Sequence, residues 1–431
     1  MGLKDSVRPL LPPTNRAFLE KTEALEQLAQ QQSDAQAHLS RQAQQVCDYL
    51  GTMQHTLESH TRYVNLEYLA KLSQNPADIL LAGWYGAENF GDELMLQTVL
   101  ETVPSELLER FCVLLWDNYF YPLDQIDPRV TILHYPNSTW ELDQLANHFS
   151  TLVWGGGAII DERQFTEDPS NINTGNLFIR LSRCMLARGK RVFSLGLSSN
   201  RELSDERYLL ELDEIVRHSA LFSVRDPYSK SALEQSGITA NCIELCEDLA
   251  FANSELASLP KHNPRPNVGT LRIALILLTT PDKATAYKQL IQSLLELSSN
   301  CGRKFELHLI PFLNERHGED DGRGYDERYL SELVEKIDGQ HVFVNSFCHA
   351  MGELHLEEYD LVISYKYHAA LIALAQGTPT LCVYESTHPH YQNKVTHLAH
   401  LFSVQDCLYS STQFESNICN IASEHLAHPI F

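Results

Sequence analysis

Residues 79–103, ILLAGWYGAENFGDELMLQTVLETV, join a buried strand to a helix through a glycine-rich turn. The apolar run at residues 79–82 predicts the strand, and apolar residues at helical spacing from Leu94 onward predict the helix. Such a turn lets backbone N–H groups approach a ligand at the helix N-terminus, where an anion is favoured. The stretch is therefore typical of the opening unit of a Rossmann-like domain.

The turn differs from the dinucleotide-binding pattern in its length and in ending with Asp92 and Glu93. Carboxylates at a helix start could cap the helix, or they could face a substrate hydroxyl as a base. A helix start is expected to lower the pKa of a carboxyl group, which suits a base better than an acid. The sequence does not choose between the two residues.

The chain has 431 residues, 43% of them hydrophobic, with a net charge of −23. This length allows more than one domain, and the acidic balance argues against a nucleic-acid partner and against docking on an anionic membrane through basic residues. Ten scattered cysteines without a CxxC motif argue against a disulfide scaffold or a zinc ribbon and favour a reducing compartment. The start has no apolar core of signal-peptide length, and no apolar run approaches the roughly 20 residues of a transmembrane segment. We expect a cytoplasmic protein, with peripheral association at the inner face of the membrane left open.

Residues 1–75 are predicted to form a separate N-terminal part, a proline-bearing tail followed by a long helical region. Residues 16–61 lack proline and place several apolar residues on one seven-residue register. A coiled coil or helical hairpin that would form a homo-oligomer and a helix packed on the globular body both fit this pattern.

From residue 76 onward, predicted strands and helices alternate through two halves. The proline-rich segment at residues 260–268 is the expected linker, so the predicted domains are residues 76–262 and 263–431. Alternating strands and helices imply parallel sheets covered by helices. The predicted fold class is α/β, with two Rossmann-like domains facing a cleft in a GT-B-like arrangement after an N-terminal helical or coiled-coil region.

Candidate site residues follow several of the predicted strands. Three consecutive glycines, Gly155, Gly156 and Gly157, mark a close backbone approach to a ligand or to a neighbouring element. Arg225 could bind a carboxylate or phosphate, or pair with Asp226 or another nearby acid. His368 stands at a helix start, where it could contact a phosphate or simply cap the helix.

These segments resemble the polysaccharide pyruvyl transferase family in a consistent order. The matching stretches, spread over roughly residues 78–405, are GWYGAENFGDE, VWGGGAIIDE, FSVRDPYSKSALEQSGI, CEDLAF, DLVISYKYHAALIALAQGTPTLCVYE and Lys394-Val395. The resemblance implies a GT-B-like fold and transfer of a pyruvyl group from phosphoenolpyruvate to a saccharide, forming a pyruvate ketal in surface polysaccharide biosynthesis. It implies phosphoenolpyruvate as co-substrate, no other cofactor, no metal, and a saccharide or lipid-linked saccharide as acceptor.

The resemblance also suggests roles for individual residues. Lys366 stands where the family usually has arginine, so the charge is kept but the bidentate fork is lost. Apart from the resemblance, His388 and His390, two residues apart in a predicted loop, could bind a metal, but no cysteine or carboxylate spacing supports this strongly. The predicted catalytic residues are Asp92, Glu93 and His368; the predicted donor-binding residues are Arg225, Lys366, His368, Lys394 and Glu385; and the predicted acceptor-binding residues are Gly86, Asn89, Gly155, Gly156, Gly157 and Asp161.

Two other functions fit the same sequence. A glycosyltransferase with a nucleotide-sugar donor would use the same kind of fold, because a fold does not determine the chemistry of its site. A non-catalytic assembly protein of a polysaccharide pathway would use the N-terminal helical region to organise its partners.

Overall fold

The computed structural model describes residues 77–116, 126–136, 138–165, 174–199, 202–263, 269–314, 324–337, 341–386 and 389–427. The predicted helix at residues 16–61, with its coiled-coil and oligomerising alternatives, lies outside these residues. Residues 264–268 of the predicted linker do so as well. The domain boundaries after residues 75 and 262 stay predictions.

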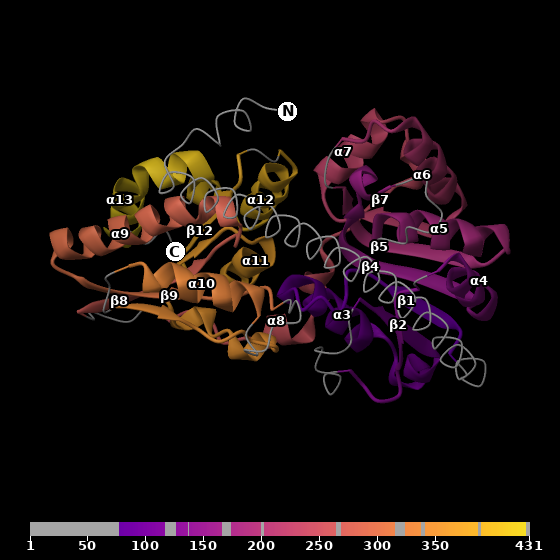
Figure 1. Cartoon of the computed structure of the whole chain (residues 1–431), viewed down its shortest axis with the longest axis horizontal. Coiled ribbons are helices and arrows are strands. Elements are labelled where there is room, and N and C mark those ends of the chain that lie inside the picture. The colour runs from indigo at the N-terminus through magenta and orange to yellow at the C-terminus, as the bar shows by residue number, and fades with distance from the viewer. Residues whose placement is uncertain are drawn as a thin grey trace, which may run out of the picture. The chain divides into compact units, whose positions relative to one another are not determined.

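The first half of the described chain forms a parallel sheet of seven strands in the order β3-β2-β1-β4-β5-β6-β7. Figure 1 labels five of them, β2, β1, β4, β5 and β7, in this succession. Apolar runs form these strands because helices cover both faces of a parallel sheet. The strand order changes direction between β1 and β4, and α/β folds bind ligands beyond the carboxyl ends of the strands at such a point. The strands are β1 (Ile79–Ala82), β2 (Phe111–Leu115), β3 (Thr131–His134), β4 (Thr151–Ile160), β5 (Arg191–Ser199), β6 (Leu221–Val224) and β7 (Glu244–Leu245).

The second half forms a parallel sheet of six described strands in the order β10-β9-β8-β11-β12-β13. Its direction changes between β8 and β11, so the carboxyl ends of these two strands mark a second place for a ligand. The strands are β8 (Thr270–Ile276), β9 (Lys304–Leu309), β10 (Val342–Val344), β11 (Leu361–Ser364), β12 (Thr380–Tyr384) and β13 (Leu408–Ser410).

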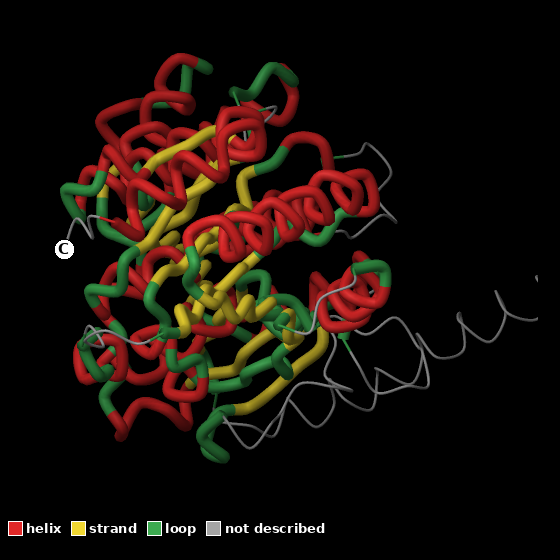
Figure 2. The backbone as a smooth tube through the Cα atoms, turned by 90° about the vertical axis from the view of Figure 1, so that its left-hand side faces the viewer, coloured by secondary structure: helices red, strands yellow, loops and turns green. Residues whose placement is uncertain are grey.

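Helices connect the strands and enclose the sheets as layers, which Figure 2 shows as red tubes around yellow strands. In the N-terminal half, α4, α5 and α6 pack side by side, and in the C-terminal half α9 packs on α13 (Figure 1). The helices are α3 (Phe90–Thr102), α4 (Thr139–His148), α5 (Thr174–Ala187), α6 (Glu206–His218), α7 (Pro227–Gln235), α8 (Ser254–Ser258), α9 (Ala284–Cys301), α10 (Tyr325–Glu335), α11 (Tyr367–Gln376), α12 (Pro389–Leu401) and α13 (Ser411–Ala427).

Strand β4 carries the three glycines within it, although the sequence predicts a strand that ends before them. Its pairing with β5 continues past the glycines, with a register shift between Gly157 and Ile160. Gly156 and Gly157 have φ angles of +85° and +90°, which side-chain-bearing residues rarely adopt. The strand therefore continues through an irregularity in its pairing. At the glycines its backbone passes close to Asp92 and Met95 of α3.

The start of α3 packs into the hydrophobic core of the C-terminal half. Phe90 and Leu94 belong to the same buried cluster as the strands β8, β9 and β11. The Phe90 and Phe312 ring centroids are 4.8 Å apart, and the Phe90 N–H donates to the Phe312 carbonyl at 3.1 Å. The turn before α3 is thus held by both halves of the molecule.

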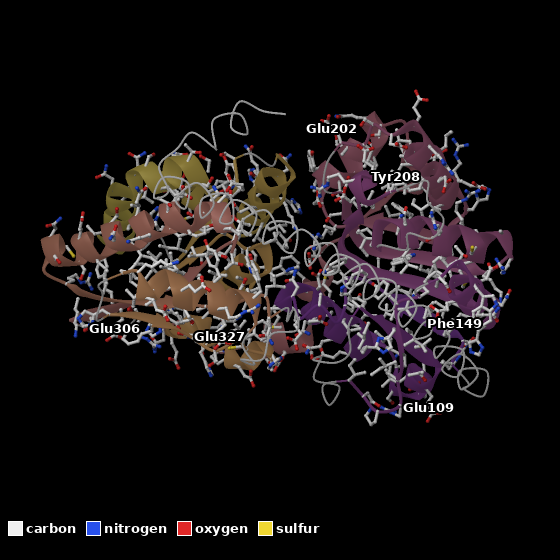
Figure 3. The ribbon with its side chains drawn as sticks, viewed as in Figure 1. Glu109, Phe149, Glu202, Tyr208, Glu306 and Glu327 are labelled. Carbon is white, nitrogen blue, oxygen red and sulfur yellow. The ribbon has the colours of Figure 1, made fainter. Side chains whose placement is uncertain are left out.

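Large apolar side chains form the core, and many charged side chains lie at the surface. Phe149 and Tyr208 are completely buried in the N-terminal half, whereas Glu109 and Glu202 lie at its outer margin (Figure 3). Of the helices that the structure describes, none is long and apolar enough to cross a membrane. The two parallel sheets with alternating helices confirm the predicted α/β class with two Rossmann-like domains.

Candidate functional site

Glu93, one of the two carboxylates predicted to be catalytic at the start of α3, binds the backbone of the turn between β1 and α3. Glu93 Oε1 accepts hydrogen bonds from the backbone N–H groups of Gly86 at 2.8 Å and Glu88 at 3.1 Å. Both residues have positive φ angles, so the turn needs this internal support. Burial raises the pKa of Glu93 well above its ordinary value. Glu93 therefore has a structural task in shaping the turn.

Asp92, its neighbour, is surrounded by charged groups of other elements. Arg225, Lys394 and Asp248 all act electrostatically on its carboxyl group, and Asp92 Oδ1 would be 3.3 Å from a Cβ placed on Gly157. Desolvation raises the pKa of Asp92 to about 7, although the two cations oppose this shift. The expected lowering by the helix start is wrong, because loss of hydration outweighs the helix dipole here.

Arg225, at the end of β6, pairs with a carboxylate that the sequence analysis did not select. Its Nη1 atom is 2.7 Å from Asp248 Oδ2, both side chains are almost completely buried, and its Nη2 donates to Ser198 Oγ at 3.0 Å. Asp226 instead caps α7 by accepting from the Ser229 N–H at 2.7 Å. Arg225 is therefore paired with another nearby acid, Asp248, and not with its sequence neighbour Asp226.

Asp248 joins both halves of the molecule at this point. Its Oδ1 accepts from the Ala250 N–H at 3.0 Å and lies 3.6 Å from His368 Nε2, which comes from the C-terminal half. Burial opposes ionisation, but Arg225 and His368 together hold the pKa of Asp248 far below its ordinary value. Asp248 is therefore a carboxylate that fixes the orientation of an arginine and a histidine.

His368 lies in the first turn of α11, directly against the start of α3. A Cβ on Gly91 would overlap the His368 ring, so only glycine allows this approach of the two helices. Burial lowers the pKa of His368, although Asp248 opposes the shift. The imidazole is therefore neutral near pH 7 and has the chemistry of a proton acceptor.

Lys394, on α12, completes a group of cations around the ring of Tyr367. Its Nζ is 5.1 Å from the ring centroid, and the guanidinium carbon of Arg225 is 5.3 Å from the same centroid. Desolvation, followed by the charge of Arg225, lowers the pKa of Lys394 to about 7. An anion bound between the two cations would favour the protonated lysine, so the arrangement suits an anionic ligand.

Five side chains thus meet where the two halves touch, and we call them the charged cluster. Four of them are predicted site residues, and the fifth, Asp248, is not, although it lies in the CEDLAF segment. The charged cluster consists of Asp92, Arg225, Asp248, His368 and Lys394.

Two predicted donor-binding residues have structural partners elsewhere. Lys366 Nζ is 2.7 Å from Asp326 Oδ2, which also accepts the backbone N–H groups of Phe312 and Leu313 at 2.8 Å. Glu385 is 2.6 Å from Lys283 Nζ and accepts from Ser411 Oγ at 3.0 Å. None of these contacts involves the charged cluster, so donor binding by Lys366 and Glu385 stays a prediction without geometric support.

The predicted acceptor-binding glycines are close to neighbouring side chains. A Cβ on Gly155 would overlap the Tyr85 hydroxyl, and a Cβ on Gly156 would lie 2.6 Å from Met95 Sδ. Gly157 is the one that borders the charged cluster, through Asp92. The close approach is thus to neighbouring elements of the protein, one of the two alternatives that the sequence left open.

Asn89 and Asp161 lie at the starts of helical segments. Asn89 precedes α3, and its backbone forms an antiparallel bridge with Leu313 of the C-terminal half. Asp161 Oδ1 accepts from Arg163 Nε at 2.9 Å and from the Arg163 N–H at 3.0 Å. Asp161 is therefore held as a cap, and its contact with an acceptor stays a prediction.

Other cavities and clusters are separate from this site. A cavity of about 1060 Å³ runs along α4, α5 and α6, but none of the predicted site residues lines it. His355, Glu357 and Glu358 could hold a metal by their proximity, yet Glu357 accepts from Gln376 at 2.6 Å and Glu358 pairs with Arg272 at 2.8 Å. The side chains of His388 and His390 lie outside the described part of the structure.

Solved structures that resemble the chain share its fold at low sequence identity. A UDP-N-acetylglucosamine 2-epimerase from Listeria monocytogenes has a TM-score of 0.51 and 12% identity, over 82% of this chain and 89% of that protein. The S. aureus protein MnaA with UDP has a TM-score of 0.51 and 9% identity, over 81% of this chain and 88% of that one. These likenesses support the predicted GT-B-like arrangement and show the fold alone.

No curated protein matches the sequence significantly. A family model, however, matches residues 89–387, which is more than half of the chain and contains the whole charged cluster except Lys394. The chain belongs to the polysaccharide pyruvyl transferase family.

Proposed function

We propose that this protein transfers the enolpyruvyl unit of phosphoenolpyruvate to two hydroxyls of a saccharide, which yields a pyruvate ketal and phosphate. The observation that carries the proposal is the charged cluster, where Arg225 and Lys394 flank Asp92 and His368 at the contact of the two halves. Phosphoenolpyruvate carries a phosphate and a carboxylate, so it needs such cations in a chain that is otherwise strongly acidic.

The first step is protonation of the donor at its methylene carbon, C3. Asp92 is the proposed acid, because its pKa of about 7 leaves a substantial protonated fraction at neutral pH. A bound dianion beside Asp92 would raise that pKa further. The proton converts C3 into a methyl group and leaves an oxocarbenium-like centre at C2, which the nearby carboxylates stabilise.

The next steps attach the two saccharide hydroxyls to C2. One hydroxyl adds to C2 and loses its proton to neutral His368, which Asp248 orients. The C2–O bond to phosphate then breaks, Arg225 and Lys394 stabilise the leaving phosphate, and the second hydroxyl adds. The two saccharide hydroxyls release two protons in total. One proton replaces the one that Asp92 gave to C3, and the other leaves on hydrogen phosphate. The proposed reaction therefore needs no other cofactor.

Release of phosphate from phosphoenolpyruvate, measured with a saccharide panel, tests the proposal. We expect saccharide-dependent release that Lys394→Gln reduces at least about 100-fold, corresponding to about 2.7 kcal/mol. Lys304→Gln, at an exposed lysine of the same half, is the control and should leave the rate unchanged.

Direct binding measurements separate the proposal from the alternatives. Phosphoenolpyruvate should raise the melting temperature of the wild type and not that of Lys394→Gln. Stabilisation by nucleotide sugars instead of phosphoenolpyruvate would overturn the proposal in favour of a glycosyltransferase. Absence of binding and turnover with either donor class would favour a non-catalytic role.

A further inference from the structure

Three aromatic side chains gather at the carboxyl ends of the first three strands of the N-terminal sheet. Trp84 follows β1, Trp116 follows β2 and Tyr135 follows β3. The Trp84 and Trp116 rings are stacked, with centroids 5.2 Å apart and an interplanar angle of 24°. Tyr135 meets Trp116 edge-on at 5.3 Å. We call these three side chains the aromatic platform.

Backbone hydrogen bonds hold the aromatic platform in place. The Trp116 N–H donates to the Tyr85 carbonyl at 2.7 Å, and the Tyr135 hydroxyl donates to the Gly83 carbonyl. A Cβ on Gly83 would overlap the Tyr85 ring, so the turn is tightly packed beneath Trp84. The backbone at Trp116 and the ring of Tyr135 are thus held, and the two indoles support each other by stacking, which lowers the cost of ordering them on binding.

Within the aromatic platform Tyr135 is buried, Trp84 is partly exposed, and Trp116 is exposed more than a purely structural tryptophan needs to be. Trp116 is 37% exposed, whereas Trp154 on β4 is completely buried and donates its indole N–H to Ser182 at 2.9 Å. Trp154 is thus a core tryptophan, with its ring buried and its indole N–H paired. A rigid, exposed indole is instead typical of a recognition surface.

The aromatic platform lies next to the charged cluster. The Tyr135 hydroxyl donates to the Gly83 carbonyl, at the start of the turn that leads into α3 and its residue Asp92. Burial raises the pKa of Tyr135, and the charges of Asp92 and Glu93 act in the same direction. Glu93 also binds the Gly86 N–H, two residues after Trp84. A ring stacked on the platform would therefore lie at the turn that carries Trp84 and leads into the first turn of α3, where Asp92 stands.

We propose that the aromatic platform binds one pyranose ring of the saccharide acceptor through the face that carries its C–H groups. The electron-rich face of an indole attracts polarised C–H bonds and leaves the hydroxyls at the ring edge free to react. The assignment of this saccharide as acceptor rests on the proposed function. The position of Trp84 on the turn that leads to Asp92 and the membership of a polysaccharide-modifying family favour a sugar as the occupant.

Saturation-transfer NMR on the full chain tests the proposal in the absence of phosphoenolpyruvate. The probes are the methyl β-D-pyranosides of glucose, galactose and mannose, with uridine monophosphate as the competing class. At least one sugar should receive saturation, strongest at its ring C–H protons. Trp116→Ala should reduce the transfer at least about fivefold, and Trp116→Phe should retain part of it.

Trp140→Ala is the matched control, because Trp140 is 47% exposed on α4 and lies outside the aromatic platform. It should leave the transfer unchanged. Trp116→Leu keeps an apolar side chain without a ring, and it replaces Trp116→Ala if that variant does not fold by its melting curve. The proposal is overturned if no sugar receives saturation, if the ring-less variants bind equally well, or if uridine monophosphate is the probe that depends on Trp116.

The experiment also separates this proposal from the proposed function. Lys394→Gln should bind the sugars like the wild type, since Lys394 is not part of the aromatic platform. Sugar binding without any binding of phosphoenolpyruvate would remove the proposed function and leave the platform as a saccharide site. Phosphoenolpyruvate binding without sugar binding would remove the platform proposal alone.

Discussion

Lys394 and Lys366 were both predicted to bind an anionic donor, and their surroundings differ in kind. Lys366 pairs at 2.7 Å with Asp326, a carboxylate that also accepts two backbone N–H groups at 2.8 Å. Lys394 lies in a poorly hydrated place beside Arg225, and its pKa falls to about 7. The first lysine has a fixed carboxylate partner, whereas an anion bound beside the second would favour its protonated form. Two lysines that are predicted to have the same role can thus differ in the charges that surround them in the folded protein.

The largest expected effect is on the activity of Lys394→Gln. Removing this cation should lower kcat/KM for phosphoenolpyruvate at least about 100-fold, because it stabilises charge on the donor and on the leaving phosphate. The melting temperature should stay the same or rise, since a charge in an unfavourable environment is lost. Steady-state kinetics with calorimetry check both, and a destabilised variant would remove the contrast between the two lysines.

Lys366→Gln should show the reverse pattern. It leaves the buried Asp326 carboxylate without its cation, so we expect a loss of about 2–3 kcal/mol in the free energy of unfolding. The value of kcat/KM should change less than about threefold. Urea unfolding measures the first quantity, and a loss of activity as large as that of Lys394→Gln would return Lys366 to the donor site.

The pH dependence of kcat/KM should separate the two lysines as well. In the free enzyme the proposed reaction requires protonated Lys394 and protonated Asp92, whose pKa values are both about 7. The value of kcat/KM should therefore fall as pH rises above 7, by about tenfold per pH unit for each required proton. Lys366→Gln should keep this alkaline limb, and a profile that stays flat between pH 6 and 9 in the wild type would contradict both assignments.

The smallest expected effect is on stability, through Asp92→Asn. Because the pKa of Asp92 is raised from 3.8 to about 7 in the folded protein, the folded state binds more protons than the unfolded state between these values. Stability is then lost as pH rises through this range. At pH 8 the variant should be more stable than the wild type by on the order of 1 kcal/mol, after allowance for solvent screening. The gain should vanish at pH 4, and an equal gain at both values would argue against this titration.

Much of the fold and part of the charged cluster can be predicted from the sequence. Arg225 and His368 follow strands of parallel sheets, and the carboxyl ends of such strands gather at one edge. The switch points in the strand order then bring residues of this kind together. Periodicity and strand ends are local signals, which is why they predict these positions.

Asp248 could not be selected from the sequence, because an acid in a short turn looks the same whether buried or exposed. Its role depends on Arg225 and His368 approaching from two other elements. The direction of the Asp92 pKa shift has the same origin, since the helix start is local and the desolvation comes from other parts of the chain. The pairing of Lys366 with Asp326 likewise depends on where α10 lies.

The packing of α3 has a consequence for how the molecule unfolds. Phe90 and Leu94 belong to the N-terminal half in sequence, but their side chains pack in the hydrophobic core of the C-terminal half. Separating the halves would expose these side chains to water and leave a void behind them. The two sheets should therefore melt as one cooperative unit, and neither half expressed alone should reach its native stability.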